Sequence, residues 1–221
     1  MELKNRFGSI FYVVLLLLSF GSSSFAAKNI KNQVTQGNYY YEEGNYEEAE
    51  KYWKIAADQG DIDAQYALGI LYEDTGRTEF SEKYYKMAAI QGDKDAQYNL
   101  GVLYDDQGNY KEAEKYYKMA AVQGDKDAQY NLGCMYDEQK NFDEAEKYYK
   151  MAAEHGDRGA QYNLGCMYDD MKKYDLAEKF YKMAADEGLK DAQYNLGLFY
   201  SDHEKKDLSK MYKEMAENNK N

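Results

Sequence analysis

Histidine and cysteine are the side chains of this sequence that could perform chemistry. His155 and His203 could act as bases or metal ligands, and Cys134 and Cys166 as nucleophiles or soft metal ligands. Catalysis requires partners at a spacing that brings them together, and neither histidine has a cysteine or serine at such a spacing. The sequence also contains no glycine-rich phosphate loop and no zinc-ligand spacing. We therefore expect no enzymatic activity, no bound metal and no cofactor.

Acidic pairs recur along the chain, and Asp105 with Asp106 is one example. Two carboxylates could act as an acid and a base, but a repeated surface charge is more often a solvated helix face. The whole chain is acidic, with 40 Asp and Glu against 28 Lys and Arg and a formal net charge of −12. Such a surface repels nucleic acid and anionic lipid. We expect a partner that carries basic residues, no nucleic acid and no stable membrane insertion.

A repeated heptapeptide, DAQYNLG, identifies the elements that must position these side chains. Consecutive copies or near copies start 32 residues apart, at Asp63, Asp95, Asp127, Gly159 and Asp191. Self-similarity with this period is typical of a solenoid whose units are helical hairpins. Proline is absent, so no residue type interrupts a helix strongly. The sequence predicts an all-α solenoid of about six 32-residue hairpins over residues 27–221.

Residues 95–127 illustrate one unit. Asp95 is a good N-cap, and the first helix then places four apolar residues on one face: Ala96, Leu100, Leu103 and Tyr104. The stretch DQGN predicts a turn, and a second apolar stripe follows: Tyr110, Ala113, Tyr117 and Ala120. Gly101 and Ala120 are small where two helices must approach closely. Gly124 is expected to end the second helix in the left-handed conformation.

The last unit differs on the core side of its second helix. Lys206, Ser209 and Lys213 stand where the preceding unit has Tyr174, Ala177 and Tyr181. A polar outer helix is what the terminal cap of a solenoid needs. We expect this end of the array to be a cap that receives no further domain.

The spacing of six residues resembles the tetratricopeptide repeat: Leu100, Gly101, Tyr104, Ala113, Tyr117 and Ala120. The stretch KMAAVQGDKDAQYNLGCMY resembles the junction of Sel-one-like repeats. The resemblance implies a right-handed superhelix of paired helices that acts as a noncatalytic protein-binding scaffold. Some secreted Sel-one-like proteins are cysteine-rich and linked to penicillin binding, but this chain has only two cysteines.

One face of each first helix is left over after packing is assigned. Tyr98, Val102 and Asp105 share this face, away from Leu100. The resemblance implies that it lines a concave groove, where a varying apolar position beside repeated tyrosines would give specificity. The candidate partner-binding residues are Tyr66, Tyr98, Asn99, Val102, Asp105, Tyr130, Asn131, Cys134, Asp137, Tyr162, Asn163, Cys166, Asp169, Tyr194 and Asn195. The alternative is that these side chains are only solvated or lightly packed.

The asparagines of this face also have two interpretations. The resemblance implies hydrogen bonds to the backbone of a bound peptide, whereas the alternative is a hydrogen bond to a neighbouring helix. The face lacks the Lys or Arg with which related proteins bind a peptide carboxylate. We expect an extended or helical protein segment with apolar and basic residues as the partner.

The first 26 residues have the pattern of an export signal. Lys4 and Arg6 precede an apolar run, Ile10–Phe20, and small residues permit cleavage after Ala26. The run is shorter than the ~20 residues of a spanning helix. We therefore predict a signal peptide over residues 1–26 and a periplasmic or secreted monomer. An extracellular factor that acts on a host or neighbouring cell is the alternative function.

The two cysteines are expected to stay free. They occupy equivalent positions in neighbouring hairpins, which pack roughly 10 Å apart. A disulfide needs Cα atoms within ~7 Å, so Cys134 and Cys166 should not form one.

Overall fold

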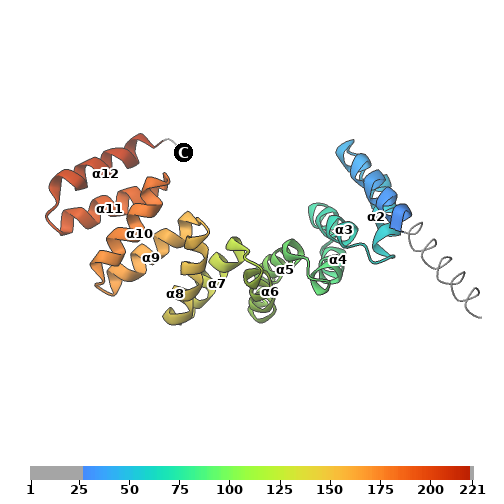
Figure 1. Cartoon of the computed structure of the whole chain (residues 1–221), viewed down its shortest axis with the longest axis horizontal. Coiled ribbons are helices and arrows are strands. Elements are labelled where there is room, and N and C mark those ends of the chain that lie inside the picture. Colours follow the sequence, from blue (N-terminus) through green and yellow to red (C-terminus); the bar gives the residue numbers. More distant parts are fainter. Residues whose placement is uncertain (1–26, 220–221) are drawn as a thin grey trace, which may run out of the picture. The chain divides into compact units, whose positions relative to one another are not determined.

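The structure is a computed structural model and describes residues 27–219 (Figure 1). Over this range every regular element is a helix and no strand is present, which confirms the all-α prediction of twelve helices. A first helix over residues 27–42 is followed by α2 (Tyr46–Ala57), α3 (Ile62–Asp74), α4 (Thr78–Ile90), α5 (Lys94–Asp106), α6 (Tyr110–Val122), α7 (Lys126–Glu138), α8 (Phe142–Glu154), α9 (Arg158–Asp170), α10 (Tyr174–Asp186), α11 (Lys190–Asp202) and α12 (Lys206–Asn218). The predicted signal peptide lies outside the described residues.

The chain divides within α5, between Ala96 and Gln97, into two compact units. In the second unit the helices pack as consecutive hairpins, α7 on α8, α9 on α10 and α11 on α12, and each hairpin also contacts the next. This arrangement is the stacked-hairpin architecture that the 32-residue period predicts. Among the described residues, no helix is long and apolar enough to cross a membrane.

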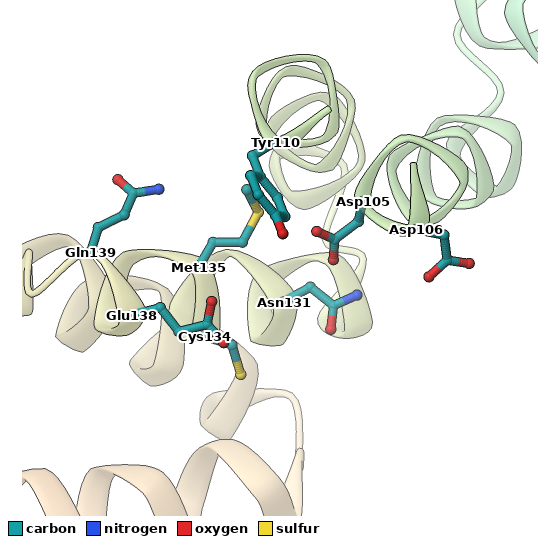
Figure 2. Close-up of a pocket in the computed structure, with 8 residues that line it drawn as sticks. All are labelled: Asp105, Asp106, Tyr110, Asn131, Cys134, Met135, Glu138 and Gln139. Carbon is teal, nitrogen blue, oxygen red and sulfur yellow. The ribbon is translucent and has the colours of Figure 1, made fainter. Parts of the chain in front are cut away.

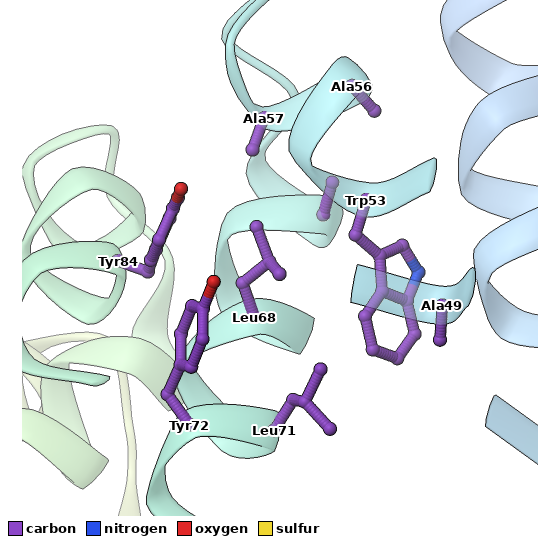
Figure 3. Packing of buried hydrophobic residues seen from close by; sticks show 9 residues of the cluster. Ala49, Trp53, Ala56, Ala57, Leu68, Leu71, Tyr72 and Tyr84 are labelled. Atoms are coloured by element: carbon purple, nitrogen blue, oxygen red, sulfur yellow. The ribbon is translucent and has the colours of Figure 1, made fainter. Parts of the chain in front are cut away.

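The core of the first unit is built from large side chains on successive helices. Figure 3 shows Leu68 and Leu71 of α3 between Trp53 of α2 and Tyr84 of α4, and all four are buried. Trp53 also donates from its indole nitrogen to Asn38 Oδ1 at 2.9 Å, so its polar edge is satisfied. The apolar residues at helical spacing therefore form the core, as the sequence pattern indicates.

The first helices begin two residues earlier than the sequence suggested. Asp93 is the N-cap of α5, because its carboxylate accepts from the Ala96 amide at 2.7 Å. Asp125 does the same for α7. The prediction that Asp95 is the N-cap is wrong, since Asp95 lies inside the first turn of α5, where its charge still favours the helix dipole.

The repeated glycine of the heptapeptide has a packing role. A Cβ atom added to Gly101 would lie 2.5 Å from a ring carbon of Tyr117, and one added to Gly165 would meet Tyr181 at the same distance. The tyrosine ring of each second helix therefore lies directly on the glycine of the first helix. In the last hairpin Lys213 stands in place of this tyrosine beside Gly197.

The repeated glutamine also has a packing role, which the sequence did not reveal. Gln129 is buried and donates to the Ala121 carbonyl at 3.0 Å, and Gln193 donates to Ala185 in the same way. These bonds satisfy a backbone carbonyl near the end of the preceding helix. Tyr110 departs from its predicted place in the apolar stripe, because it is 61% exposed at the start of α6.

Two kinds of turn connect the helices. Gly124 ends α6 with a φ of +84°, as predicted for a left-handed cap. The tighter turn inside the α5–α6 hairpin uses Gly108 with a φ of +71°. In the next hairpin Lys140 occupies that position with a φ of +59°, a conformation that costs a non-glycine residue free energy.

Candidate functional site

Most of the predicted binding residues lie at equivalent positions on the first helices of the second unit, and we call this set the first-helix face. It consists of the outward side chains of α5, α7, α9 and α11. Asp137 and Tyr194 are exposed, and the other side chains of this face are half-buried. The half-buried ones are Tyr98, Asn99, Val102, Asp105, Tyr130, Asn131, Cys134, Tyr162, Asn163, Cys166, Asp169 and Asn195. Tyr66 is half-buried in the first unit and packs on Tyr85. These residues are therefore accessible on one side.

Asparagines of the first-helix face contact tyrosines of the preceding hairpin. Asn195 donates to the Tyr162 hydroxyl at 2.6 Å, and Asn163 donates to the Tyr149 hydroxyl at 3.1 Å. Asn131 is hydrogen-bonded to Tyr98. The interpretation that these asparagines bind a neighbouring helix thus has direct geometric support, and their role toward a bound peptide stays a prediction.

A pocket of about 530 Å³ opens where α7 meets the α5–α6 hairpin (Figure 2). In Figure 2 the Tyr110 ring lies over Met135, and Asp105 points toward Asn131. The lining combines apolar and acidic groups: Asp105, Asp106, Tyr110, Asn131, Cys134, Met135, Glu138 and Gln139. We call this cavity pocket A. The exposed Tyr110, misplaced by the sequence analysis, is thus one of its walls.

An equivalent cavity of about 320 Å³ lies one repeat later, and we call it pocket B. Each of its lining residues stands 32 positions after a residue of pocket A: Asp137, Phe142, Asn163, Cys166, Met167, Asp170 and Met171. Asp137, Asn163 and Cys166 were predicted from the sequence, whereas the aromatic and methionine walls were not. The 32-residue spacing of Tyr110 and Phe142 could have indicated them.

The third equivalent position is filled by aromatic side chains. The His203 ring lies 4.3 Å from the Phe199 ring and 4.6 Å from the Tyr174 ring, measured between centroids. His203 Nδ1 also lies 2.7 Å from the Phe199 carbonyl oxygen. The side chains that would line a third pocket therefore pack against one another instead.

The carboxylates of the first-helix face lie near one another. Partial burial and the neighbouring Asp106 raise the pKa of Asp105, and partial desolvation and Asp170 raise the pKa of Asp137. Four carboxylates of this face form no ion pair within residues 27–219. They are Asp105, Asp106, Asp137 and Asp170. The face therefore presents negative charge without a cation of its own, which favours a positively charged ligand.

The cysteines participate in hydrogen bonds with tyrosines. The Tyr149 hydroxyl lies 3.5 Å from Cys134 Sγ and donates to it, and Tyr181 is hydrogen-bonded to Cys166. Burial raises the pKa of the Cys134 thiol, so the reactive thiolate is disfavoured. Both cysteines are free, which agrees with the prediction.

The opposite surface, which we call the second-helix face, carries paired charges. Glu114 of α6 accepts from Lys118 and from the Tyr136 hydroxyl of the next hairpin, both at 2.6 Å. These two hydrogen bonds lower the pKa of Glu114. Glu146 binds Lys150 and Tyr168 in the same way. The acids of this face therefore connect neighbouring hairpins.

The described residues contain no group of three or more His, Cys, Asp or Glu side chains that could hold a metal. His155 lies beside Gln129 Oε1 at 3.0 Å and continues the polar contacts of the buried glutamines. The arrangement on the first-helix face offers apolar pockets and negative charge. It is suited to binding a side chain.

Family comparisons match most of the chain to helical repeats. The family described as Tetratricopeptide repeat matches residues 34–96, 82–128 and 98–159, and a second tetratricopeptide repeat family matches residues 159–186. The Sel1 repeat matches residues 190–210. No curated protein matches the sequence.

Solved structures with this fold include two Sel1-like proteins. A Sel1 repeat protein from Oxalobacter formigenes is 30% identical with a TM-score of 0.69, over 86% of this chain and 83% of that one. The protein c5321, a protective antigen of uropathogenic Escherichia coli with an SLR fold, is 28% identical with a TM-score of 0.70. The match covers 88% of this chain but only 47% of c5321.

A more distant likeness concerns the fold alone. Pseudomonas aeruginosa pilF is 18% identical with a TM-score of 0.66, over 84% of this chain and 89% of that one. Repeats of these kinds generally mediate protein–protein interaction. On the family matches and the Oxalobacter relative, this chain belongs to the tetratricopeptide and Sel1 repeat family.

Proposed function

We propose that this protein is a noncatalytic scaffold that binds a segment of a partner protein on the first-helix face. The observation that supports this most is the pairing of pockets A and B, which repeat the same apolar walls and the same acidic rim. A segment that places apolar side chains in the pockets would bury them. Its Lys or Arg side chains would meet carboxylates that lack an ion pair of their own.

The half-buried tyrosines supply the rest of the surface. Partial burial raises the pKa of Tyr130 and of Tyr162 to about 12, so both phenols are neutral at physiological pH. Tyr162 is held by Asn195. Large side chains that are already ordered lose little entropy on binding. The tyrosine row is therefore a pre-arranged contact surface.

Peptide binding would test this function directly. An array of random twelve-residue peptides would be incubated with the chain lacking residues 1–26 and with its Tyr130→Ala, Tyr162→Ala variant. We expect the retained peptides to be enriched in Lys or Arg next to apolar residues, and the variant to lose them. Retention of the same peptides by the variant, with its helical content unchanged, would contradict binding on this face.

We also propose that the protein works outside the cytoplasm, in a periplasm or after secretion. The apolar run Ile10–Phe20 behind Lys4 and Arg6 supports this proposal. A factor that acts on a host or neighbouring cell is the second candidate, favoured by the 28% identity to the protective antigen c5321. Mass spectrometry of the exported chain should find a mature N-terminus at Ala27. Retention of residues 1–26 in the cytoplasm would contradict both proposals.

A further inference from the structure

In the four hairpins that have a buried tyrosine on the repeated glycine, the neighbour of the tyrosine hydroxyl differs from one hairpin to another. In the α3–α4 hairpin Tyr85 donates to Glu73 at 2.6 Å. In the α5–α6 hairpin the Tyr117 hydroxyl lies beside Asp105 and acts to lower the pKa of that carboxyl, against the larger raising effect of burial. Glu73 and Asp105 are equivalent positions, 32 residues apart. In these two hairpins the carboxylate of the first helix is therefore already engaged by a tyrosine.

The next two hairpins use a thiol instead. Tyr149 donates to Cys134 Sγ at 3.5 Å, and within residues 27–219 no tyrosine hydrogen bond reaches Asp137, the counterpart of Asp105. Tyr181 is likewise bonded to Cys166. The change of acceptor coincides with one sequence difference. The position that holds the thiol is Ile70 or Val102 in the earlier hairpins, and these aliphatic side chains cannot accept a hydrogen bond.

The choice between a carboxylate and a thiol as the neighbour of the tyrosine hydroxyl has its largest consequence at pocket B. Asp137 lines pocket B together with Phe142 and Met167, so an aspartate without an ion pair stands beside an apolar cavity. In pocket A the corresponding Asp105 has the Tyr117 hydroxyl beside it. At the third junction Asp169 faces the position that Phe199 and His203 fill.

We propose that Cys134 determines the specificity of pocket B, because it accepts the Tyr149 hydrogen bond and leaves Asp137 available for a cationic side chain of the partner. The occupant is a protein segment that places a Lys or Arg at Asp137 and an apolar side chain against Phe142. The charge complementarity of an aspartate without a cation supports this partner. The inference deepens the proposed function and depends on it for the identity of the partner.

The hydrogen-bond exchange can be tested without a ligand. Carboxyl NMR titration would compare wild type with Cys134→Val and Cys134→Ser. Valine cannot accept the tyrosine hydroxyl, so Tyr149 should turn to Asp137 and lower its pKa, because a hydrogen bond favours the charged form. Serine keeps an acceptor and should leave the pKa of Asp137 close to that of wild type. The reciprocal Val102→Cys should raise the pKa of Asp105. An unchanged Asp137 pKa in Cys134→Val would overturn the role of the cysteine.

The second measurement uses two synthetic peptides, acetyl-(Lys-Leu-Ala)₄-amide and acetyl-(Gln-Leu-Ala)₄-amide. Cys134→Val should weaken binding of the lysine peptide about threefold to tenfold and leave the glutamine peptide unaffected. Val102→Cys should strengthen binding of the lysine peptide. Equal weakening of both peptides by Cys134→Val would mean that the cysteine acts only through packing, against the proposal.

The two measurements separate the inference from the function on which it rests. If wild type binds neither peptide, the proposed partner chemistry fails, while the NMR titration still decides whether Cys134 controls Asp137. If wild type binds the lysine peptide and Asp137→Asn binds it equally well, the aspartate is not the anchor. Glu144→Gln is the matched charge control, because Glu144 pairs with Lys147 on the second-helix face.

Discussion

The two faces of the second unit use acidic side chains in opposite ways. On the second-helix face Glu114 binds Lys118 and Tyr136, and hydrogen bonds lower its pKa. On the first-helix face Asp137 forms no ion pair among the described residues, and its surroundings raise its pKa. The difference indicates that one set of charges connects neighbouring hairpins, whereas the other makes no ion pair among the described residues. A charge that does not stabilise the fold is explained more readily by a ligand.

The packing between the two faces should show the largest effect on stability. Gly165→Ala places a Cβ atom 2.5 Å from the Tyr181 ring, and overpacking of this kind costs about 2–3 kcal/mol. Thermal unfolding followed by circular dichroism measures it. Gly159→Ala is the control in the same helix: its Cβ atom would lie 3.0 Å from the Tyr130 ring, a contact that the aspartate of other repeats accommodates, so we expect a much smaller loss than at Gly165. Equal destabilisation by both substitutions would contradict the glycine–tyrosine contact.

Loss of a paired acid on the second-helix face should cause the second-largest loss of unfolding free energy. Glu114→Ala removes the acceptor of Tyr136 and Lys118, and we expect a loss of about 1–2 kcal/mol, reduced by the partial exposure of the site. Glu112→Ala removes only an exposed ion pair with Lys115 and should cost less than about 0.5 kcal/mol. Chemical denaturation of both variants measures the difference. Similar losses would mean that the bond to Tyr136 between hairpins does not contribute.

A substitution in a hairpin turn should have a smaller effect, and it should stabilise the protein rather than destabilise it. Lys140 has a φ of +59° where the preceding hairpin has Gly108. Lys140→Gly should stabilise the protein by roughly 0.5–1 kcal/mol, because glycine adopts this conformation without a steric penalty. Gly108→Lys, measured in the same denaturation assay, should destabilise by a similar amount. Destabilisation by Lys140→Gly would show that unfolded-state entropy outweighs the turn.

Removing an acid should have opposite effects on stability on the two faces, and both effects should depend on pH. Asp137→Asn should stabilise the fold slightly at pH 7, by at most about 0.3 kcal/mol because solvent screens this exposed carboxylate, since the raised pKa means that the charged form is disfavoured. This gain should shrink as the pH falls through the folded-state pKa toward the unfolded value. The loss caused by Glu114→Ala should also shrink on acidification, as the pH falls through the lowered pKa of Glu114. Destabilisation by Asp137→Asn at pH 7 would remove the contrast between the faces.

Much of this fold could be predicted from the period of the sequence. The repeated Leu100 and Gly101 indicated buried positions, and both are buried. The N-cap was misplaced because both Asp93 and Asp95 are capping residues, and only the hydrogen bond from Asp93 to the Ala96 amide distinguishes them. Tyr110 was misplaced because an aromatic side chain at the start of a helix can either enter the core or line a pocket.

The candidate site was only partly predictable. Helical spacing predicted that Tyr98 and Asp105 share one face of α5, and both side chains are half-buried. The spacing of residues cannot show that Tyr149 donates to Cys134, since a hydroxyl chooses its acceptor by three-dimensional geometry. For the same reason the closure of the third pocket by Phe199 and His203 was not foreseen.

Protection of the native cysteines from alkylation would show whether a partner segment occupies the first-helix face. Cys134 and Cys166 line pockets A and B, so alkylation followed by mass spectrometry would report on both pockets. With acetyl-(Lys-Leu-Ala)₄-amide bound, both thiols should react more slowly. A cysteine introduced on the second-helix face by Lys147→Cys should react at its unbound rate. Protection of the residue 147 thiol, with Cys134 and Cys166 reacting as in the free protein, would mean that the peptide does not bind on the first-helix face.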